Sequence, residues 1–174
     1  MLFRSEALLK FNGRSRRPQM DLAKDLGIKE YPNAAGGCLL TDRNFSNRLR
    51  DLIKYNQLSL SNIELLKFGR HFRLNNDAKL IVGRDESENI QIEKLAKDQD
   101  HLFRPTEDFA GPTSLGRGQF SSDLLRIAGE ITSYYCDLNL KSKVDIAYRR
   151  IPEKDSAILS FSPILEETIA SLRL

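Results

Sequence analysis

The sequence predicts an α+β fold with a largely antiparallel sheet packed against helices. Three observations lead to this prediction. Strand-like and helical segments do not alternate strictly after residue 70, as they would in a parallel α/β protein. No glycine-rich dinucleotide-binding loop is present. The turn-forming run Asn75-Asn76-Asp77 separates strand-like segments at 71–74 and 79–83, which favours a hairpin.

The first 60 residues are predicted to be mostly helical. Residues 2–11 form a short amphipathic helix, and a second helix begins at Pro18 and ends at Gly27. A loop over 28–44 follows, and Asp42 or Asn44 caps the next helix, 45–55. The core stripe of that helix consists of Phe45, Leu49, Leu52 and Ile53.

The central segment predicts a hairpin between two helices. The run Ser61-Asn62-Ile63-Glu64 has the capping-box pattern and opens a short helix that stops at Gly69. After the hairpin, a helix over 86–97 is expected, and acidic residues favour its N-terminus. Residues 101–104 are a predicted strand, and 105–118 are predicted to be irregular because of their glycine-containing turn signals.

The last segment predicts the longest helix, two strands and a final helix. Ser121 or Ser122 caps the long helix, which runs to about Asp137 with apolar residues at intervals of four and three. Cys136 falls in this helix and is expected to pack in the core. Strands follow at 143–148 and 157–161, and Pro163 begins a helix that reaches about residue 172.

Composition places the chain among ordinary soluble proteins. It has 174 residues, 40% hydrophobic and 29% charged, and no apolar run of the length that a membrane span needs. Two cysteines make no disulfide framework, and with two separated histidines they predict no metal site. We expect a cytoplasmic protein.

Positive charge is concentrated in the first part of the chain. Residues 1–73 hold 14 Lys and Arg against 7 Asp and Glu, about +7, whereas residues 74–174 hold 13 against 17, about −4. This asymmetry is typical of a protein that binds a polyanion such as RNA, and the alternative is chance clustering on solvated faces. DNA is not expected as a partner. The candidate RNA-binding residues are Arg14, Arg16, Arg17, Arg43, Arg48, Arg50, Arg70, His71, Arg84 and Arg117.

Cys38 is the candidate catalytic residue. It follows Gly36-Gly37, where the backbone can bend and approach a ligand closely. A nucleophilic thiolate needs nearby positive charge or a helix N-terminus, and Arg43 and the helix 45–55 offer both. The alternative is a structural cysteine in a tight loop.

Two resemblances to known families cover the chain. The segments GRSRRPQ, LAKDLGIKEYP, AAGGCLLTD and FSNRLRDL, in that order over 13–52, resemble the C-terminal part of PP-loop tRNA 2-thiouridylase-like proteins. The later segments resemble the NFACT-R type of RNA-binding domain; they are Val82-Gly83-Arg84-Asp85, Glu88-Asn89, Asp100 to Arg104, Gly111-Pro112, Ser133-Tyr134-Tyr135 and Val144 to Tyr148. The implied domains are a PP-loop remnant at 1–40, a connecting helix at 41–60 and an NFACT-R-like domain at 61–174.

The resemblance implies a tRNA-binding module that orients tRNA for sulfur transfer. The chain resembles part of a tRNA sulfurtransferase but lacks the Ser-Gly-Gly-x-Asp-Ser type of loop that holds ATP in this family, so ATP-dependent adenylation of tRNA is not assigned to it alone. No cofactor is expected in the chain, because ATP would come with the missing PP-loop domain. A PP-loop domain or a sulfur-carrier protein is an implied partner. The alternatives are a protein-interaction domain that binds no RNA, and a sulfurtransferase in which Cys38 carries a persulfide.

Overall fold

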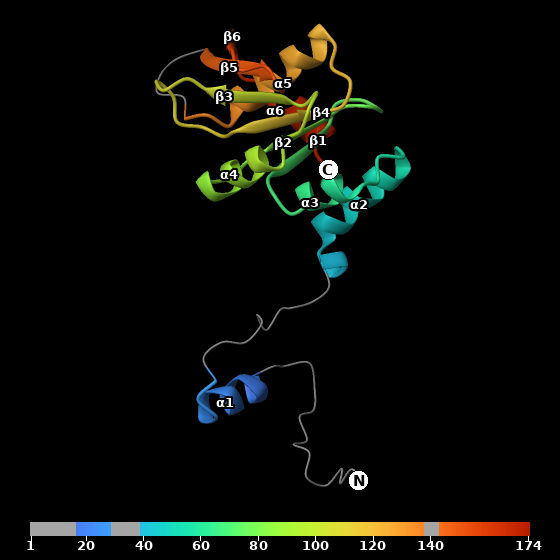
Figure 1. Cartoon of the computed structure of the whole chain (residues 1–174), viewed down its shortest axis with the longest axis vertical. Coiled ribbons are helices and arrows are strands. Elements are labelled where there is room, and N and C mark those ends of the chain that lie inside the picture. The colour runs from blue at the N-terminus through green and yellow to red at the C-terminus, as the bar shows by residue number, and fades with distance from the viewer. Residues whose placement is uncertain (1–16, 29–38, 138–142) are drawn as a thin grey trace. The chain divides into compact units, whose positions relative to one another are not determined.

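The computed structural model describes residues 17–28, 39–137 and 143–174, which form two compact units, Met1–Thr41 and Asp42–Leu174 (Figure 1). The described part of the first unit contains α1 (Arg17–Asp25) and η2 (Leu39–Thr41), a 3-10 helix. α1 confirms the helix predicted after Pro18, and none of its residues is buried. The helix predicted over 2–11 and the candidate residue Cys38 lie outside the described residues.

The second unit contains a six-stranded sheet in the order β1-β2-β4-β3-β5-β6. Every neighbouring pair of strands is antiparallel, which confirms the predicted α+β fold. The strands are β1 (Arg70–Arg73), β2 (Lys79–Val82), β3 (His101–Pro105), β4 (Ser114–Arg117), β5 (Val144–Arg150) and β6 (Ala157–Phe161). The helices are α2 (Arg43–Lys54), α3 (Leu60–Leu65), α4 (Glu86–Lys94), α5 (Ser122–Tyr134) and α6 (Glu166–Leu172).

Helices cover both faces of this sheet. On one face, Phe72, Val82 and Ile146 pack with Ile131 of α5 and Ile169 of α6. On the other face, α3 and α4 pack against the sheet through a cluster that contains Leu65, Ile81, Ile92, Leu102 and Leu115. α2 adjoins this layer through a small cluster of its own with Leu66 (Figure 1). Alternating side chains of each central strand therefore point into two different cores.

Side-chain caps set the helix starts. Asp42 caps α2 by accepting a hydrogen bond from the Phe45 backbone N–H at 2.7 Å, which decides between the two predicted caps. Ser121 caps α5 in the same way. The predicted capping box at Ser61 is wrong by two residues, because Ser59 accepts the hydrogen bond from Asn62 N–H at 3.3 Å and places Ser61 inside α3. α6 begins at Glu166, three residues later than the predicted start at Pro163.

β4 lies within the segment that was predicted to be irregular. It pairs with β2 on one side and β3 on the other, so it is a central strand. Its glycine resembles a turn signal in the sequence but has a packing role, because a Cβ on Gly116 would lie 2.6 Å from the ring of Phe120. The prediction failed because glycine in a strand marks close packing as well as a turn.

The C-terminal residues adjoin the outer edge of the sheet. Arg173 forms an isolated antiparallel bridge with Phe72, and the Leu174 backbone N–H donates to the carbonyl of His71 at 3.0 Å. Within the described ranges, no helix is long and apolar enough to cross a bilayer.

Candidate nucleic-acid interface

Two glycines shape the junction between the end of β2, the start of β1 and α4. Gly69 has φ +69°, and a Cβ there would lie 2.6 Å from the carbonyl oxygen of Val82. A Cβ on Gly83 would lie 2.0 Å from Oδ1 of Asn89. That Oδ1 accepts a hydrogen bond from the Thr113 backbone N–H at 3.0 Å, so Asn89 ties α4 to the segment before β4. Side chains at either glycine would force these backbones apart.

Three guanidinium groups converge on this junction. The carbonyl oxygen of Gly69 accepts hydrogen bonds from Nη2 of Arg48 at 3.0 Å and from Nη2 of Arg84 at 2.9 Å. The carbonyl oxygen of Gly83 accepts from Nη1 of Arg70 at 3.1 Å. The three arginines come from α2, β1 and the loop after β2, so the fold gathers charges that are far apart in the sequence.

A cleft of about 550 Å³ lies beside this junction, and its lining includes Arg70, Arg84 and Tyr135. The guanidinium carbon of Arg70 lies 4.5 Å from the ring centroid of Tyr135, a cation–π contact. Tyr134 packs edge-on against Tyr135, with 5.0 Å between the ring centroids. The cleft thus combines positive charge with an aromatic ring, the pair of groups that single-stranded RNA contacts use. We call this surface the arginine cleft.

Acidic groups hold the arginine cleft in shape. Oε2 of Glu88 accepts from the backbone N–H of Gly69 at 3.1 Å and of Arg84 at 2.9 Å, and it lies 3.5 Å from Nε of Arg84. The Arg84 side chain is still 47% exposed, so its charge can reach a ligand. Asp85 caps α4, whose N-terminus was predicted to favour acidic residues, and the hydrogen bond that Asp85 accepts from the Glu88 backbone N–H lowers the pKa of Asp85.

Arg48 is an internal part of this arrangement. It is 8% exposed, and besides Gly69 its Nη1 donates to the carbonyl of Leu66 at 2.7 Å. Burial, with the charge of Arg84 adding to it, lowers the pKa of Arg48. The predicted phosphate contact by Arg48 is therefore corrected: its guanidinium is used in joining α2 to the turn before β1.

His71 and Arg117 lie on the opposite face of the sheet from Arg70 and are also used internally. His71 is 1% exposed, so its ring is not on the surface, and its predicted role in RNA binding remains a prediction. Arg117 pairs with Asp100, with Nη2 at 2.6 Å from Oδ2, and donates to Asn62 and to the carbonyl of Leu95. Arg117 lies between Gly116 and Gly118, but it is the last residue of the central strand β4 and its side chain is only 12% exposed, so the exposed, flexible backbone expected there is corrected.

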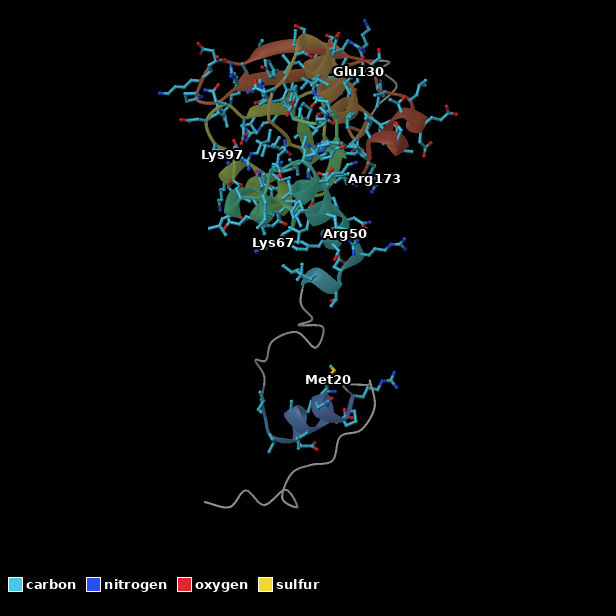
Figure 2. All side chains as sticks on the ribbon, turned by 90° about the vertical axis from the view of Figure 1, so that its right-hand side faces the viewer. Met20, Arg50, Lys67, Lys97, Glu130 and Arg173 are labelled. Atoms are coloured by element: carbon cyan, nitrogen blue, oxygen red, sulfur yellow. The ribbon has the colours of Figure 1, made fainter. Side chains whose placement is uncertain are left out.

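The remaining candidate site residues lie either at the surface or outside the residues that the structure describes. Arg43 and Arg50 are exposed on α2 (Figure 2 labels Arg50). Arg17 is exposed at the start of α1, in the other unit. Arg14 and Arg16 lie outside the described residues, as does Cys38. Their predicted roles remain predictions.

The sequence missed the aromatic part of the arginine cleft. Tyr135 was assigned to the buried stripe of the long helix, whereas it is half-buried at the end of α5, under Arg70. The available signal was its position directly after the last helical residue. Cys136, one residue further, is 6% exposed, as predicted, and burial raises the pKa of its thiol to about 11. In the described part of the chain, no group of three His, Cys, Asp or Glu side chains is arranged to hold a metal ion.

Comparisons with known proteins give one family match. Residues 69–173 match the family model NFACT-R_2, described as the NFACT protein RNA binding domain. The matched segment begins at Gly69 and so includes the arginine cleft. No curated protein matches the chain. None of these findings relates it to the PP-loop thiouridylases that residues 13–52 resemble.

One example of a similar fold is a solved structure. It is the C-terminal part of the fibronectin/fibrinogen-binding protein from Streptococcus suis, with a TM-score of 0.52 and 15% sequence identity. The similarity covers 72% of this chain, and the chain spans 59% of that structure. At this identity the likeness concerns the fold alone.

Proposed function

The chain belongs to the NFACT protein RNA-binding domain family, and on that basis we propose that it binds RNA through the arginine cleft. The observation that supports this surface is the convergence of three guanidinium groups on Gly69 and Gly83, with Arg70 over the ring of Tyr135. Arg84 supplies a phosphate contact, and Tyr135 with Arg70 supplies a stacking surface for an unpaired base. Arg48 holds the junction from behind and adds to its positive potential.

Tyr135 and Arg70 favour RNA with accessible single-stranded bases. A ring that is half-buried at the end of a helix can stack on a splayed base but cannot enter the deep major groove of an RNA duplex. Loops of a folded RNA such as tRNA present such bases. We therefore propose structured RNA with exposed loops, of which tRNA is the representative, as the ligand class.

The test is fluorescence anisotropy with a labelled tRNA transcript at about 50 and 200 mM salt, a range over which phosphate contacts weaken strongly. Arg84→Ala should weaken binding at low salt. It should also reduce the slope of log affinity against log salt concentration by about one, the change expected for one lost phosphate contact. Arg70→Ala should cost about 1–3 kcal/mol of binding free energy, because the stacking surface loses the guanidinium group that lies over the ring of Tyr135. A DNA oligonucleotide of matched loop sequence shows whether the 2′-hydroxyl is read.

Arg126→Ala is the matched control for Arg84→Ala. Arg126 forms an i,i+4 ion pair with Glu130 on α5, as Arg84 does with Glu88, and both side chains are about half exposed. The two variants therefore lose the same charge and the same kind of ion pair. Equal effects of the two variants on tRNA affinity would contradict the arginine cleft as the binding surface.

A role in tRNA thiolation remains a narrower hypothesis. It comes from the resemblance of residues 13–52, which include Cys38, to PP-loop thiouridylases. Its test is mass-spectrometric detection of a persulfide on Cys38 after incubation with a sulfur donor, with Cys38→Ser as control. If tRNA fails to bind at low salt and a protein partner is captured instead, the third hypothesis, a protein-interaction domain, replaces RNA binding.

A further inference from the structure

A second hollow lies on the other face of the sheet from the Arg70–Tyr135 contact. This cavity of about 270 Å³ is lined by residues of α2, α3, β1, β2, β4 and the 97–100 turn. Its apolar lining includes Leu52, Leu65, Leu66 and Ile81, each at most 2% exposed as a residue. Polar groups of Lys79, His71 and Arg117 line it as well. We call it the β2 cavity.

His71, which lines the β2 cavity, has a buried hydrogen-bond acceptor without a donor. Nε2 of His71 lies 2.9 Å from the carbonyl oxygen of Phe68 and 3.2 Å from that of Leu65. Carbonyl oxygens only accept, so Nε2 carries the hydrogen and Nδ1 is the acceptor. Burial, reinforced by the charges of Lys79 and Arg48, places the pKa of His71 well below 6.5, so the ring is neutral at pH 7. Nδ1 is buried and has no hydrogen-bond partner among the described residues.

Lys79 also lines this cavity and offers donors. Its Nζ forms an ion pair with Oδ2 of Asp51 at 3.0 Å and makes no hydrogen bond to any other group among the described residues. Asp51 is already engaged by both Nε and Nη2 of Arg73. An ammonium group carries three donors, so most of the donor capacity of Lys79 is unused in a residue that is 5% exposed.

Strand register places these two groups on one side of the sheet. His71 pairs with Ile81, and Arg73 pairs with Lys79, so the four side chains of the β1–β2 hairpin point to the same face. Four buried side-chain N or O atoms lack a hydrogen bond in the described part of the chain, and two of them belong to residues that line this one cavity. Each such atom costs about 1–3 kcal/mol. A ligand that presents one donor and one acceptor would satisfy both.

We propose that the β2 cavity binds a single nucleobase, one edge of which donates to Nδ1 of His71 and accepts from Nζ of Lys79, while its ring lies on the leucine and isoleucine side chains. Every nucleobase presents neighbouring donors and acceptors on one edge and an apolar flat face. The charges of the lining favour a neutral group over a phosphate, because Lys79, Lys97 and Arg117 are balanced by Asp77, Asp98 and Asp100. The proposed RNA binding identifies the source of the base as an RNA loop, and a free nucleoside is the other source.

The first experiment uses free nucleosides and needs no RNA. Adenosine, guanosine, cytidine and uridine are titrated in turn into ¹⁵N-labelled full-length protein, and the ring nitrogens of His71 are followed by NMR. Binding of at least one nucleoside should shift the Nδ1 resonance, because this atom gains a hydrogen bond. Lys79→Met should lower the affinity for that nucleoside by about tenfold or more, since it removes a charged donor and keeps the side-chain length. Lys154→Met, at an exposed lysine outside the lining, should leave it unchanged.

The second experiment separates the β2 cavity from the arginine cleft. An RNA loop containing 2-aminopurine is titrated while its fluorescence and its anisotropy are both measured. Entry of the base into the cavity should raise its fluorescence by unstacking it. Lys79→Met should suppress this rise and leave the salt-dependent anisotropy, whereas Arg84→Ala should weaken the anisotropy change.

Each outcome decides the inference. No shift of His71 with any nucleoside overturns it, even if RNA binds, and so do equal effects of Lys79→Met and Lys154→Met. Nucleoside binding without RNA binding upholds the cavity as a base site and rejects the proposed function. If Lys79→Met does not fold, the titration of the unaltered protein still decides through the His71 resonance.

Discussion

The two faces of the sheet treat positive charge in different ways. At the arginine cleft, Arg70 and Arg84 bond to backbone carbonyls and keep part of their surface exposed. On the opposite face, Arg73, Lys79 and Arg117 pair across three neighbouring strands and are matched with the carboxylates of Asp51 and Asp100. Arg84 also forms an ion pair with Glu88, but its side chain stays 47% exposed and its charge can reach a ligand, whereas the ion pairs of Arg73 and Arg117 on the opposite face are buried. This difference indicates that burial, and not the number of arginines, distinguishes the proposed RNA surface from the opposite face.

The largest expected effect comes from removing a buried ion pair on the face opposite the arginine cleft. Arg117→Ala should lower the free energy of unfolding by about 3–5 kcal/mol, because it leaves Asp100 buried without its partner. Asp100 is 2% exposed, and Arg117 bonds as well to Asn62 and to the Leu95 carbonyl. Urea denaturation measures the change, with Arg126→Ala as the control. A loss below about 1 kcal/mol, the range of surface pairs, would mean that this ion pair is solvated.

The next effect concerns the backbone of the arginine cleft. Gly83→Ala should destabilise the protein by about 1–3 kcal/mol, because the new Cβ overlaps the Asn89 amide and the surroundings must shift. The contact distance would be 2.0 Å. The same variant should weaken tRNA binding more than Arg84→Ala does, since the Gly83 carbonyl also positions Arg70. Thermal melting and anisotropy measure the two effects. Gly27→Ala, at φ +68° with nothing within 4 Å of the new Cβ, measures the cost of backbone strain without overlap.

The pH dependence of stability should distinguish Lys79 from an exposed lysine. Burial, only partly offset by Asp51, lowers the pKa of Lys79 from 10.5 to about 8. Between these values the unfolded chain binds more protons than the folded one, so this group makes stability rise with pH from about 8 to 10.5. The unfolding free energy of the unaltered protein minus that of Lys79→Met should therefore increase with pH over that range. A constant difference, measured by urea denaturation at several pH values, would contradict a buried ammonium.

The smallest stability change belongs to the exposed side. Arg84→Ala and Arg126→Ala should each alter the free energy of unfolding by about 1 kcal/mol or less, because each removes a partly exposed i,i+4 ion pair. Only Arg84→Ala should reduce tRNA affinity. This combination of nearly equal stability with unequal affinity would confirm that the arginine cleft serves binding. Strong destabilisation by Arg84→Ala would instead show that Arg84, like Arg48, mainly stabilises the fold.

Several features were predictable because they depend on residues close in sequence. The cap at Asp42, the acidic N-terminus of α4 and the hairpin around Asn75-Asn76-Asp77 are all formed within a few residues of chain. The buried position of Cys136 was predicted, although this residue lies two positions beyond the end of α5 and not within the helix. β4 was missed because its strand pairing comes from β2 and β3, which lie at a distance along the chain, while its glycines locally resemble turns.

The sequence by itself determined most of the elements, the antiparallel architecture and the class of positively charged candidates, because periodicity, caps and turns act over short stretches of chain. Only the tertiary structure decided which candidates remain available to a ligand. Arg48 bonds to carbonyls 18 and 21 residues away, and Arg117 bonds to a side chain 55 residues away. Arg70 and Tyr135 come together from β1 and the end of α5. Exposure depends on partners that folding brings from distant segments, and no local pattern encodes their identity.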